Sequence, residues 1–368
     1  MNIAVLTSSR ADYGIYLTLL DELKKDPFFN LEIIAFGTHL SKKHGLTISD
    51  IVKDGYDTIH KINSLVEDDS EKGIAISYGK TVLNFSDFWT VYKFDLVFCL
   101  GDRFEMSAAV QAGIPFGVKF AHIHGGETTL GAIDNIYRDQ ITSASYLHFT
   151  STNTYKEKVT RLIQKGNNVF NVGSLSLSNI SDFQPIEREI LLNDFNIPNE
   201  EYALVTFHPE TINPENNYDY VNQMSLALIE ISKTINIVIT LPNADTFGSV
   251  FREEIIKLVN ILPNRIFLVE NFGKKNYFSA MLFSKILIGN TSSGILEAAS
   301  FGKYVINVGD RQKGRLQSKN IYNVTFNYLE ISSTFDIAIS KGKFIGENIY
   351  YKKGTVKKII KHLLKEIN

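Results

Sequence analysis

The order of apolar runs along this chain of 368 residues constrains its fold more than any other feature. Short runs rich in β-branched residues alternate with longer stretches in which apolar residues recur at helical spacing. This alternation is typical of a parallel sheet with helices on both faces. The strands expected from it are 3–6, 31–36, 96–100, 116–122, 146–149, 169–172, 202–207, 235–240, 266–269, 286–288 and 304–307.

The length and the spacing of these strands predict two domains rather than one. A polar, irregular stretch with Pro185 and Pro198 separates the two groups of strands. We therefore predict an α/β protein with two Rossmann-like, doubly wound domains, residues 1–175 and 176–351. Residues 352–368 have apolar positions at helical spacing with lysines on the other face. Such a helix can lie on a membrane, but we expect it to dock on the protein and complete the first domain.

Composition excludes several classes of protein. The net charge of −2 argues against a nucleic-acid partner. The single cysteine, Cys99, cannot form an intrachain disulfide and belongs to no CxxC zinc pair, so we expect a buried strand thiol and not a nucleophile. The sequence shows neither a signal peptide nor a run of roughly 18 apolar residues. A cytoplasmic protein with no membrane partner is expected.

Ligands of open α/β sheets bind at the carboxyl ends of the strands. After the first strand, a turn of small residues carries Arg10 into a helix without the GxGxxG pattern. Arg10 could bind phosphate there or be an ordinary exposed side chain. After the strand 96–100 comes Asp102, placed for a catalytic carboxylate or for capping the next helix.

The next strand ends in the run His122-Ile-His124-Gly-Gly-Glu127, and Asp134 follows. Strand alternation would put both histidines on one face. Their spacing matches no strong zinc pattern, so we expect no metal. Asp102, Glu127 and Asp134 form a carboxylate set on adjacent loops that could do acid/base work or could be surface acids.

In the second half, two successive strands end in His208 and Asn243, which would face the same cleft. The run 288–297 leads a strand into a Gly/Ser/Thr turn that opens a helix, a geometry that favours anions. Ser292 and Ser293 add hydroxyls there.

Two charged residues extend this second-half site. Glu297, within the predicted helix, suits the hydroxyls of a ribose. Arg311 follows the next strand and would complete a diphosphate clamp.

A collinear set of motifs runs through nearly the whole chain. They are Ser9-Arg-Ala-Asp-Tyr, Gly37-Thr-His-Leu, Gly101-Asp-Arg, His122-Ile-His-Gly-Gly-Glu, Ile133-Asp134 to Arg138, Phe207-His-Pro-Glu, Pro242-Asn, Gly289-Asn-Thr-Ser-Ser-Gly and Gly309-Asp-Arg-Gln-Lys-Gly. In these motifs the chain resembles the UDP-N-acetylglucosamine 2-epimerases, specifically the hydrolysing branch that makes N-acetylmannosamine for sialic acid synthesis. The resemblance implies a glycosyltransferase-B-type fold with a UDP cleft between two domains. It also implies no metal or cofactor, and assembly as a homodimer or homotetramer.

The resemblance also implies roles for individual residues. The acid/base groups would be Asp102, Glu127 and Asp134, with His208 added from the cleft. Phosphate contacts would be Arg10, Thr291, Ser292, Ser293 and Arg311. The rest of the UDP and the sugar would meet Glu297 (ribose), Tyr277 (uracil), Asn243 (cleft lining) and His39, Arg103 and Arg138 (sugar).

The implied reaction has two steps. Asp102 or Asp134 removes the C2 proton as UDP leaves anti, and water then adds to the 2-acetamidoglucal, with Glu127 as partner in hydration. The chain departs from the pattern at His124, where non-hydrolysing relatives have a glutamate, and at Asp139, where a histidine is common. The alternatives left open are hydrolysis of UDP-N,N′-diacetylbacillosamine for legionaminic acid, a non-hydrolysing epimerase, a UDP-sugar transferase and an inactive UDP-sugar sensor.

Overall fold

The computed structural model describes residues 1–368 except 69, 131–132, 211–213, 242–247 and 368. Contacts between residues divide the chain into two compact units. The first unit comprises Met1–Glu127, Asp134–Asn179 and Tyr350–Asn368, and the second comprises Thr128–Ile133 and Ile180–Ile349.

The first unit is built on a seven-stranded sheet in the order β3-β2-β1-β4-β5-β6-β7, in which every pair of neighbours is parallel. Its strands are β1 (Asn2–Thr7), β2 (Asn30–Phe36), β3 (Thr58–Ile62), β4 (Leu96–Leu100), β5 (Phe120–Ile123), β6 (Leu147–Thr150) and β7 (Val169–Asn171). Its helices are α1 (Arg10–Lys25), α2 (Ile48–Lys53), α3 (Glu71–Val91), α4 (Phe104–Gly113), α5 (Asp134–Ala144), α6 (Asn153–Ile163) and α13 (Thr355–Ile367).

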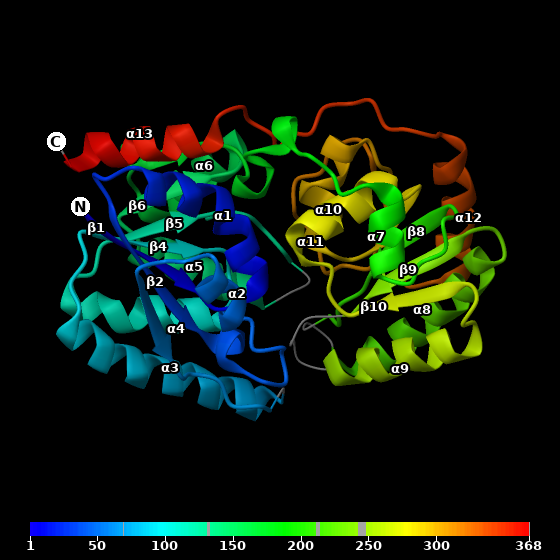
Figure 1. Cartoon of the computed structure of the whole chain (residues 1–368), viewed down its shortest axis with the longest axis horizontal. Helices are drawn as coiled ribbons and strands as arrows, with labels where there is room; N and C mark the ends of the chain where they lie inside the picture. Colours follow the sequence, from blue (N-terminus) through cyan, green and yellow to red (C-terminus); the bar gives the residue numbers. More distant parts are fainter. Residues whose placement is uncertain (69, 131–132, 211–213, 242–247, 368) are drawn as a thin grey trace. The chain divides into compact units, whose positions relative to one another are not determined.

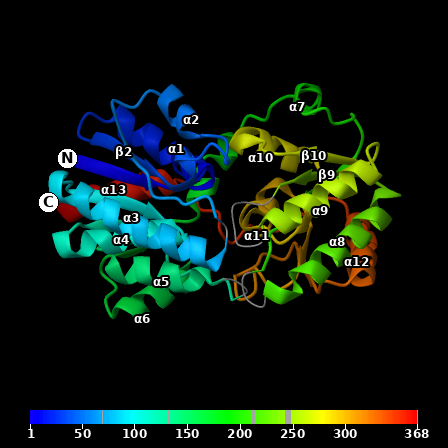
Figure 2. The ribbon, with the colours of Figure 1, turned by 90° about the horizontal axis from the view of Figure 1, so that it is seen from below.

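Helices cover both faces of this sheet, as β1 illustrates. Ile3 and Val5 join one core together with α1 and α13, whereas Ala4 and Leu6 join the opposite core together with α3 and α4. The alternation follows from the two-residue period of a strand. Figures 1 and 2 show α3 and α4 side by side on that opposite face.

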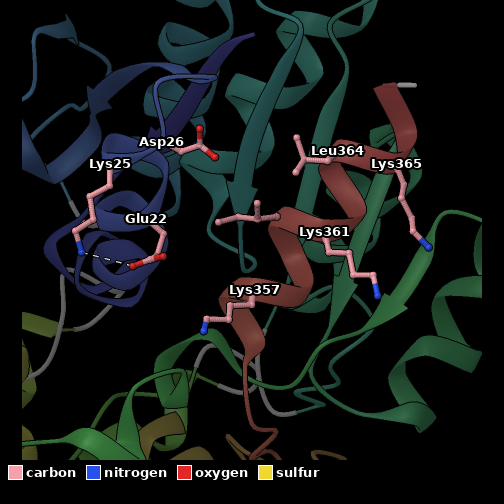
Figure 3. Close-up of a pocket in the computed structure, with 8 residues that line it drawn as sticks. Glu22, Lys25, Asp26, Lys357, Lys361, Leu364 and Lys365 are labelled. Carbon is pink, nitrogen blue, oxygen red and sulfur yellow. Dashed lines mark hydrogen bonds and ion pairs between the residues drawn. The ribbon is translucent and has the colours of Figure 1, made fainter.

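The last helix, α13, belongs to the first unit. Val356, Ile359 and Leu363 lie in the core that α1 also covers. Its lysines line a surface groove of about 580 Å³ between α13 and α1, shown in Figure 3. The helix therefore docks on its own protein through its apolar face. Among the described residues, no helix is long and apolar enough to cross a membrane.

The second unit has a six-stranded parallel sheet in the order β10-β9-β8-β11-β12-β13. Its strands are β8 (Tyr202–Thr206), β9 (Asn236–Thr240), β10 (Ile266–Val269), β11 (Ile286–Gly289), β12 (Val305–Val308) and β13 (Ile321–Val324). Its helices are α7 (Arg188–Asp194), α8 (Asn217–Ser232), α9 (Gly248–Ile261), α10 (Gly273–Phe283), α11 (Ser292–Leu296) and α12 (Tyr328–Ser340). One core contains α8, α9 and α12, and the other contains α7 and α10. Each unit is thus a doubly wound parallel sheet, which confirms the predicted α/β class.

Three details differ from the sequence prediction. The strand predicted at 116–122 begins only at Phe120, because a 3-10 turn over Ile114–Phe116 ends at Gly117 in a left-handed conformation (φ 67°). The strands β3 and β13 were not predicted. The segment Thr128–Ile133 belongs with the second unit, not the first, since the Leu130 N–H donates to the Lys313 carbonyl (2.7 Å).

Candidate functional site

The turn after β1 is organised by one carboxylate. Asp12 accepts hydrogen bonds from the Ser8 N–H (2.8 Å), the Ser9 N–H (3.1 Å) and the Thr7 hydroxyl (2.6 Å). Ser9 in turn caps α1 by accepting from the Asp12 N–H. These bonds fix the turn so that Arg10 begins α1, and this residue is exposed.

His39 supports the same turn from inside the protein. Its ring is fully buried, with Nε2 at 2.9 Å from the Thr7 hydroxyl and Nδ1 at 2.8 Å from the Thr47 hydroxyl. Burial lowers the pKa of His39. The structure therefore places His39 beneath the Arg10 turn, where its ring bonds Thr7 and Thr47; that it borders a sugar stays a prediction.

Asp102 follows β4 by way of Gly101, whose φ is 77°. The residue that caps α4 is Arg103, so the capping role considered for Asp102 is not realised. The Asp102 carboxylate instead pairs with the Arg138 guanidinium and keeps 24% of its side-chain surface exposed. The Arg103 guanidinium contacts both carboxylate oxygens of Glu105 (3.0 and 3.2 Å). The structure thus leaves Asp102 partly accessible beside a fixed positive charge.

His122 lies in β5 and His124 directly after it, and the two do not share a strand face, contrary to the prediction. β5 ends at Ile123, and His124 has a left-handed φ of 66°. His122 lies between the Thr142 hydroxyl (3.0 Å) and the Gly101 carbonyl (2.9 Å), and burial lowers its pKa to about 3. His122 is therefore neutral and holds the backbone just before Asp102.

His124 belongs to a second buried network. Its Nε2 accepts from the Leu175 N–H (3.2 Å), which assigns the ring proton to Nδ1, 2.9 Å from Glu127. Glu127 is only 1% exposed and also accepts from the Ser151 hydroxyl (2.8 Å). The ring nitrogens of His122 and His124 are thus engaged within the protein. The described residues contain no group of three or more His, Cys, Asp or Glu side chains that could hold a metal ion.

Arg138 connects Asp102 with the His124–Glu127 network. Its guanidinium pairs with Asp102, donates to the His124 carbonyl (2.9 Å) and lies 3.9 Å from Glu127. Asp134 begins α5 four residues earlier, so it lies on the same side of that helix as Arg138. The three carboxylates of the sequence prediction therefore differ in setting. Asp102 and Asp134 are partly accessible, whereas Glu127 is enclosed.

In the second unit, Asn290 joins the ends of two strands. It follows β11, and its fully buried side chain bonds both the N–H and the carbonyl of His208, two residues after β8 (2.8 Å each). β11 and β8 can approach this closely because residue 289 is glycine. A Cβ there would collide with the Thr206 carbonyl oxygen. Sequence reasoning gave Asn290 no role, although it lies inside a recognised motif.

The hydroxyl residues after β11 form a local cluster. Thr291 caps α11, and its hydroxyl lies 3.3 Å from that of Ser293. The Tyr277 hydroxyl from α10 lies 2.7 Å from the Ser293 hydroxyl, and burial raises the pKa of Tyr277. The helix that begins at Ser292 has only five residues. A helix this short has a weak dipole, so the predicted anion site would depend mainly on hydroxyls and nearby cations.

Glu297 ends this short helix instead of lying within it. Lys274 of α10 is close enough that the negative charge of Glu297 favours its protonated form, yet burial still lowers the Lys274 pKa to about 8. Sequence reasoning did not find Lys274. Asn243, predicted to line the cleft, lies outside the described residues.

Arg311 follows β12 and is held at two points. Its N–H donates to the Glu210 carboxylate (3.1 Å), and its guanidinium donates to the Asn290 carbonyl (3.3 Å). Glu210 was also missed as a site residue. An arginine restrained in this way is suited to a phosphate-bearing ligand.

Comparisons with known proteins identify the family. The family model for UDP-N-acetylglucosamine 2-epimerase matches residues 21–364. The chain is 33% identical to the GDP/UDP-N,N′-diacetylbacillosamine 2-epimerase (hydrolyzing) of Campylobacter jejuni, covering 89% of this chain and 85% of that protein. It is 32% identical to the polysialic acid biosynthesis protein P7 of Escherichia coli, covering 100% and 95%. It is 30% identical to the UDP-N,N′-diacetylbacillosamine 2-epimerase (hydrolyzing) of Legionella pneumophila, covering 95% and 90%.

A solved structure shows the same fold. The UDP-GlcNAc 2-epimerase from Neisseria meningitidis, bound to UDP-GlcNAc, matches with a TM-score of 0.80 over 99% of this chain and 100% of that chain, at 19% identity. Both the sequence matches and this fold cover most of the chain. The protein therefore belongs to the UDP-N-acetylglucosamine 2-epimerase family.

Proposed function

We propose that this protein is a hydrolysing 2-epimerase, which converts a UDP-linked 2-acetamido sugar into the free C2 epimer and UDP. The main support is the relative from Campylobacter jejuni, a hydrolyzing 2-epimerase by name, at 33% identity over 89% of this chain. The partly exposed Asp102 carboxylate, the restrained Arg311 and the hydroxyls of Tyr277 and Ser293 are the kinds of group that this chemistry needs.

In the first step, a carboxylate takes the C2 proton, the C2–H electrons form the C1=C2 double bond, and the C1–O bond to UDP breaks. We assign the base to Asp102 or Asp134, because both are partly accessible and flank Arg138. A C2 proton is weakly acidic, so the base must be close and oriented. The Arg138 guanidinium pairs with the Asp102 carboxylate and fixes its direction.

In the second step, water adds across the double bond. Its oxygen bonds to C1, and C2 takes a proton on the opposite face from the one removed. We propose that Glu127 assists this hydration through the His124–Glu127–Arg138 network, since its side chain is 1% exposed. Direct contact with the sugar would then come from Asp102, Asp134 and Arg103.

The departing UDP gains negative charge as the C1–O bond breaks. We propose that Arg10, Arg311 and the hydroxyls of Ser292 and Ser293 stabilise that charge, which is the largest single contribution in many such sites. The remaining contacts are proposed as ribose by Glu297, uracil by Tyr277, and cleft lining by Asn243, Thr291 and His208.

For the sugar, we favour UDP-N,N′-diacetylbacillosamine, because two of the relatives carry that name. UDP-N-acetylglucosamine, which would yield N-acetylmannosamine for sialic acid synthesis, is the second candidate. The Escherichia coli relative, a polysialic acid biosynthesis protein matched over the whole chain, supports it. The proposed assembly is a homodimer or homotetramer, which light scattering on the purified protein would measure.

The experiment is a parallel assay of EDTA-treated protein with both UDP-sugars, with products followed by NMR. We expect free UDP and a free sugar epimerised at C2, formed with higher kcat/KM from UDP-N,N′-diacetylbacillosamine. A product that retains UDP would instead indicate a non-hydrolysing epimerase. Activity lost with EDTA would indicate a metal, and no turnover of either sugar would refute the proposal.

A further inference from the structure

Glu210 is a buried carboxylate that the mechanism above does not use. It lies two residues after His208, and only 5% of its surface is exposed. One carboxylate oxygen, Oε1, accepts hydrogen bonds from the N–H groups of both Asp310 (2.6 Å) and Arg311 (3.1 Å). Bonds to an ionised acceptor are stronger than neutral ones. Glu210 therefore fixes the backbone at the point where the Arg311 side chain begins.

The backbone of Glu210 is itself held in place. Its N–H donates to the Asn217 side-chain oxygen (3.0 Å), and its carbonyl accepts from the Asn217 side-chain nitrogen (2.9 Å). Asn217 is fully buried at the start of α8. The carboxylate thus extends from a fixed point of the second unit towards the turn after β12.

The turn that receives this carboxylate is packed directly against it. Gly309 has a φ of 78°, and a Cβ at this position would lie 2.5 Å from Glu210 Oε1 and would also collide with the Phe326 ring. Only glycine fits there without displacing the carboxylate. The contact between Glu210 and the turn therefore depends on glycine at position 309.

The other end of Arg311 is held by Asn290. The Asn290 carbonyl accepts from the Arg311 guanidinium (3.3 Å) and from the Gln312 side chain (2.9 Å), while the Asn290 side chain holds His208. Arg311 is thus restrained at its backbone by Glu210 and at its guanidinium by Asn290. An arginine restrained in this way loses less conformational entropy when it binds an anion.

We propose that Glu210 is a positioning residue for Arg311, which directs the guanidinium at the diphosphate of a UDP-linked ligand without touching that ligand itself. The inference rests on the proposed function, because it takes Arg311 as a phosphate contact. Glu210 acts through hydrogen-bond acceptance. A glutamine at this position keeps an oxygen that can accept from both N–H groups, whereas an alanine keeps none.

The test measures UDP affinity by calorimetry for the wild type, Glu210→Gln, Glu210→Ala and the control Glu253→Ala. Glu253 is an exposed glutamate of α9 in the same unit. We expect Glu210→Ala to weaken UDP binding by about 10- to 100-fold, the range for misplacing a binding group by a fraction of an ångström to an ångström. Glu210→Gln and Glu253→Ala should bind close to the wild-type value.

A double-mutant cycle separates positioning from general structural damage. In an Arg311→Ala background, followed by NMR titration at high UDP concentration, Glu210→Ala should cause no further loss. An equal loss in both backgrounds, or Glu210→Gln binding as weakly as Glu210→Ala, would overturn the inference. If Glu210→Ala does not fold by circular dichroism, Glu210→Asp, which withdraws the carboxylate by one methylene, takes its place in the cycle. A wild type that binds no UDP would overturn the proposed function as well. Wild-type and Glu210→Ala proteins that bind UDP equally would overturn this inference alone.

Discussion

His148 makes the stability of this protein depend on pH in a way that can be calculated. It lies on β6 and is fully buried, and burial lowers its pKa from 6.5 to about 4. Below pH 6.5 the unfolded chain therefore binds a proton that the folded protein does not. The free energy of unfolding is therefore at its full value above pH 6.5 and decreases as the pH falls towards 4. Between pH 7.5 and pH 5, the difference between these two pKa values lowers the free energy of unfolding by about 2 kcal/mol.

His122 adds a similar loss, because burial lowers its pKa to about 3. The two histidines together should lower the free energy of unfolding by about 4 kcal/mol between pH 7.5 and pH 5. Replacing His148 with glutamine removes one of the two titrating groups. The pH-dependent loss should then shrink by about 2 kcal/mol, whatever the variant's stability at pH 7.5.

The assay is urea unfolding of wild type and His148→Gln at both pH values, followed by circular dichroism. Comparing the two proteins cancels the titration of all other groups, provided that the slopes with urea agree. If both proteins lose the same free energy between pH 7.5 and pH 5, the buried, neutral state assigned to His148 is wrong.

Three further predictions follow from single side chains. If Asp102 rather than Asp134 is the C2 base, Asp102→Asn should bind UDP as the wild type does but lose turnover by about 10²- to 10⁴-fold in kcat; unchanged kcat would assign the base to Asp134. Cys99 is buried with its pKa raised to about 12, so Ellman's reagent should not react with it at pH 8 until the protein unfolds, and fast labelling of the native protein would contradict this. Leu363→Ala should lower the free energy of unfolding by about 2–5 kcal/mol in urea melts, because Leu363 is fully buried in the first unit's core; a loss below about 1 kcal/mol would mean that α13 is not docked there.

The sequence was sufficient for the central strands and for the two-sheet architecture. Central parallel strands such as β4 and β8 are apolar throughout because both faces are covered, and such runs are easily found. The strands that were missed, β3 and β13, lie at sheet edges and carry exposed or half-exposed polar residues. Their position depends on pairing with a neighbour, which local sequence does not reveal.

The position of a candidate site residue was predictable where its side chain directly follows a recognisable strand, as with Asp102 after β4. It was not predictable where a side chain acts on backbone groups distant in sequence. Glu210 and Asn290 are of this second kind. Glu210 holds Arg311, 101 positions away, and Asn290 holds His208, 82 positions away. The positive φ of His124, which separates it from His122, is also a tertiary effect.

In the proposed mechanism, UDP leaves by elimination across C1–C2 and water then adds to the resulting double bond. The most direct measurement is turnover of UDP-N,N′-diacetylbacillosamine or UDP-N-acetylglucosamine in D₂O, with the free sugar examined by NMR and mass spectrometry. We expect one solvent deuterium at C2 in each product molecule, together with inverted configuration at C2 and free UDP. A released sugar that keeps its original C2 hydrogen and configuration would show simple hydrolysis and would refute this mechanism.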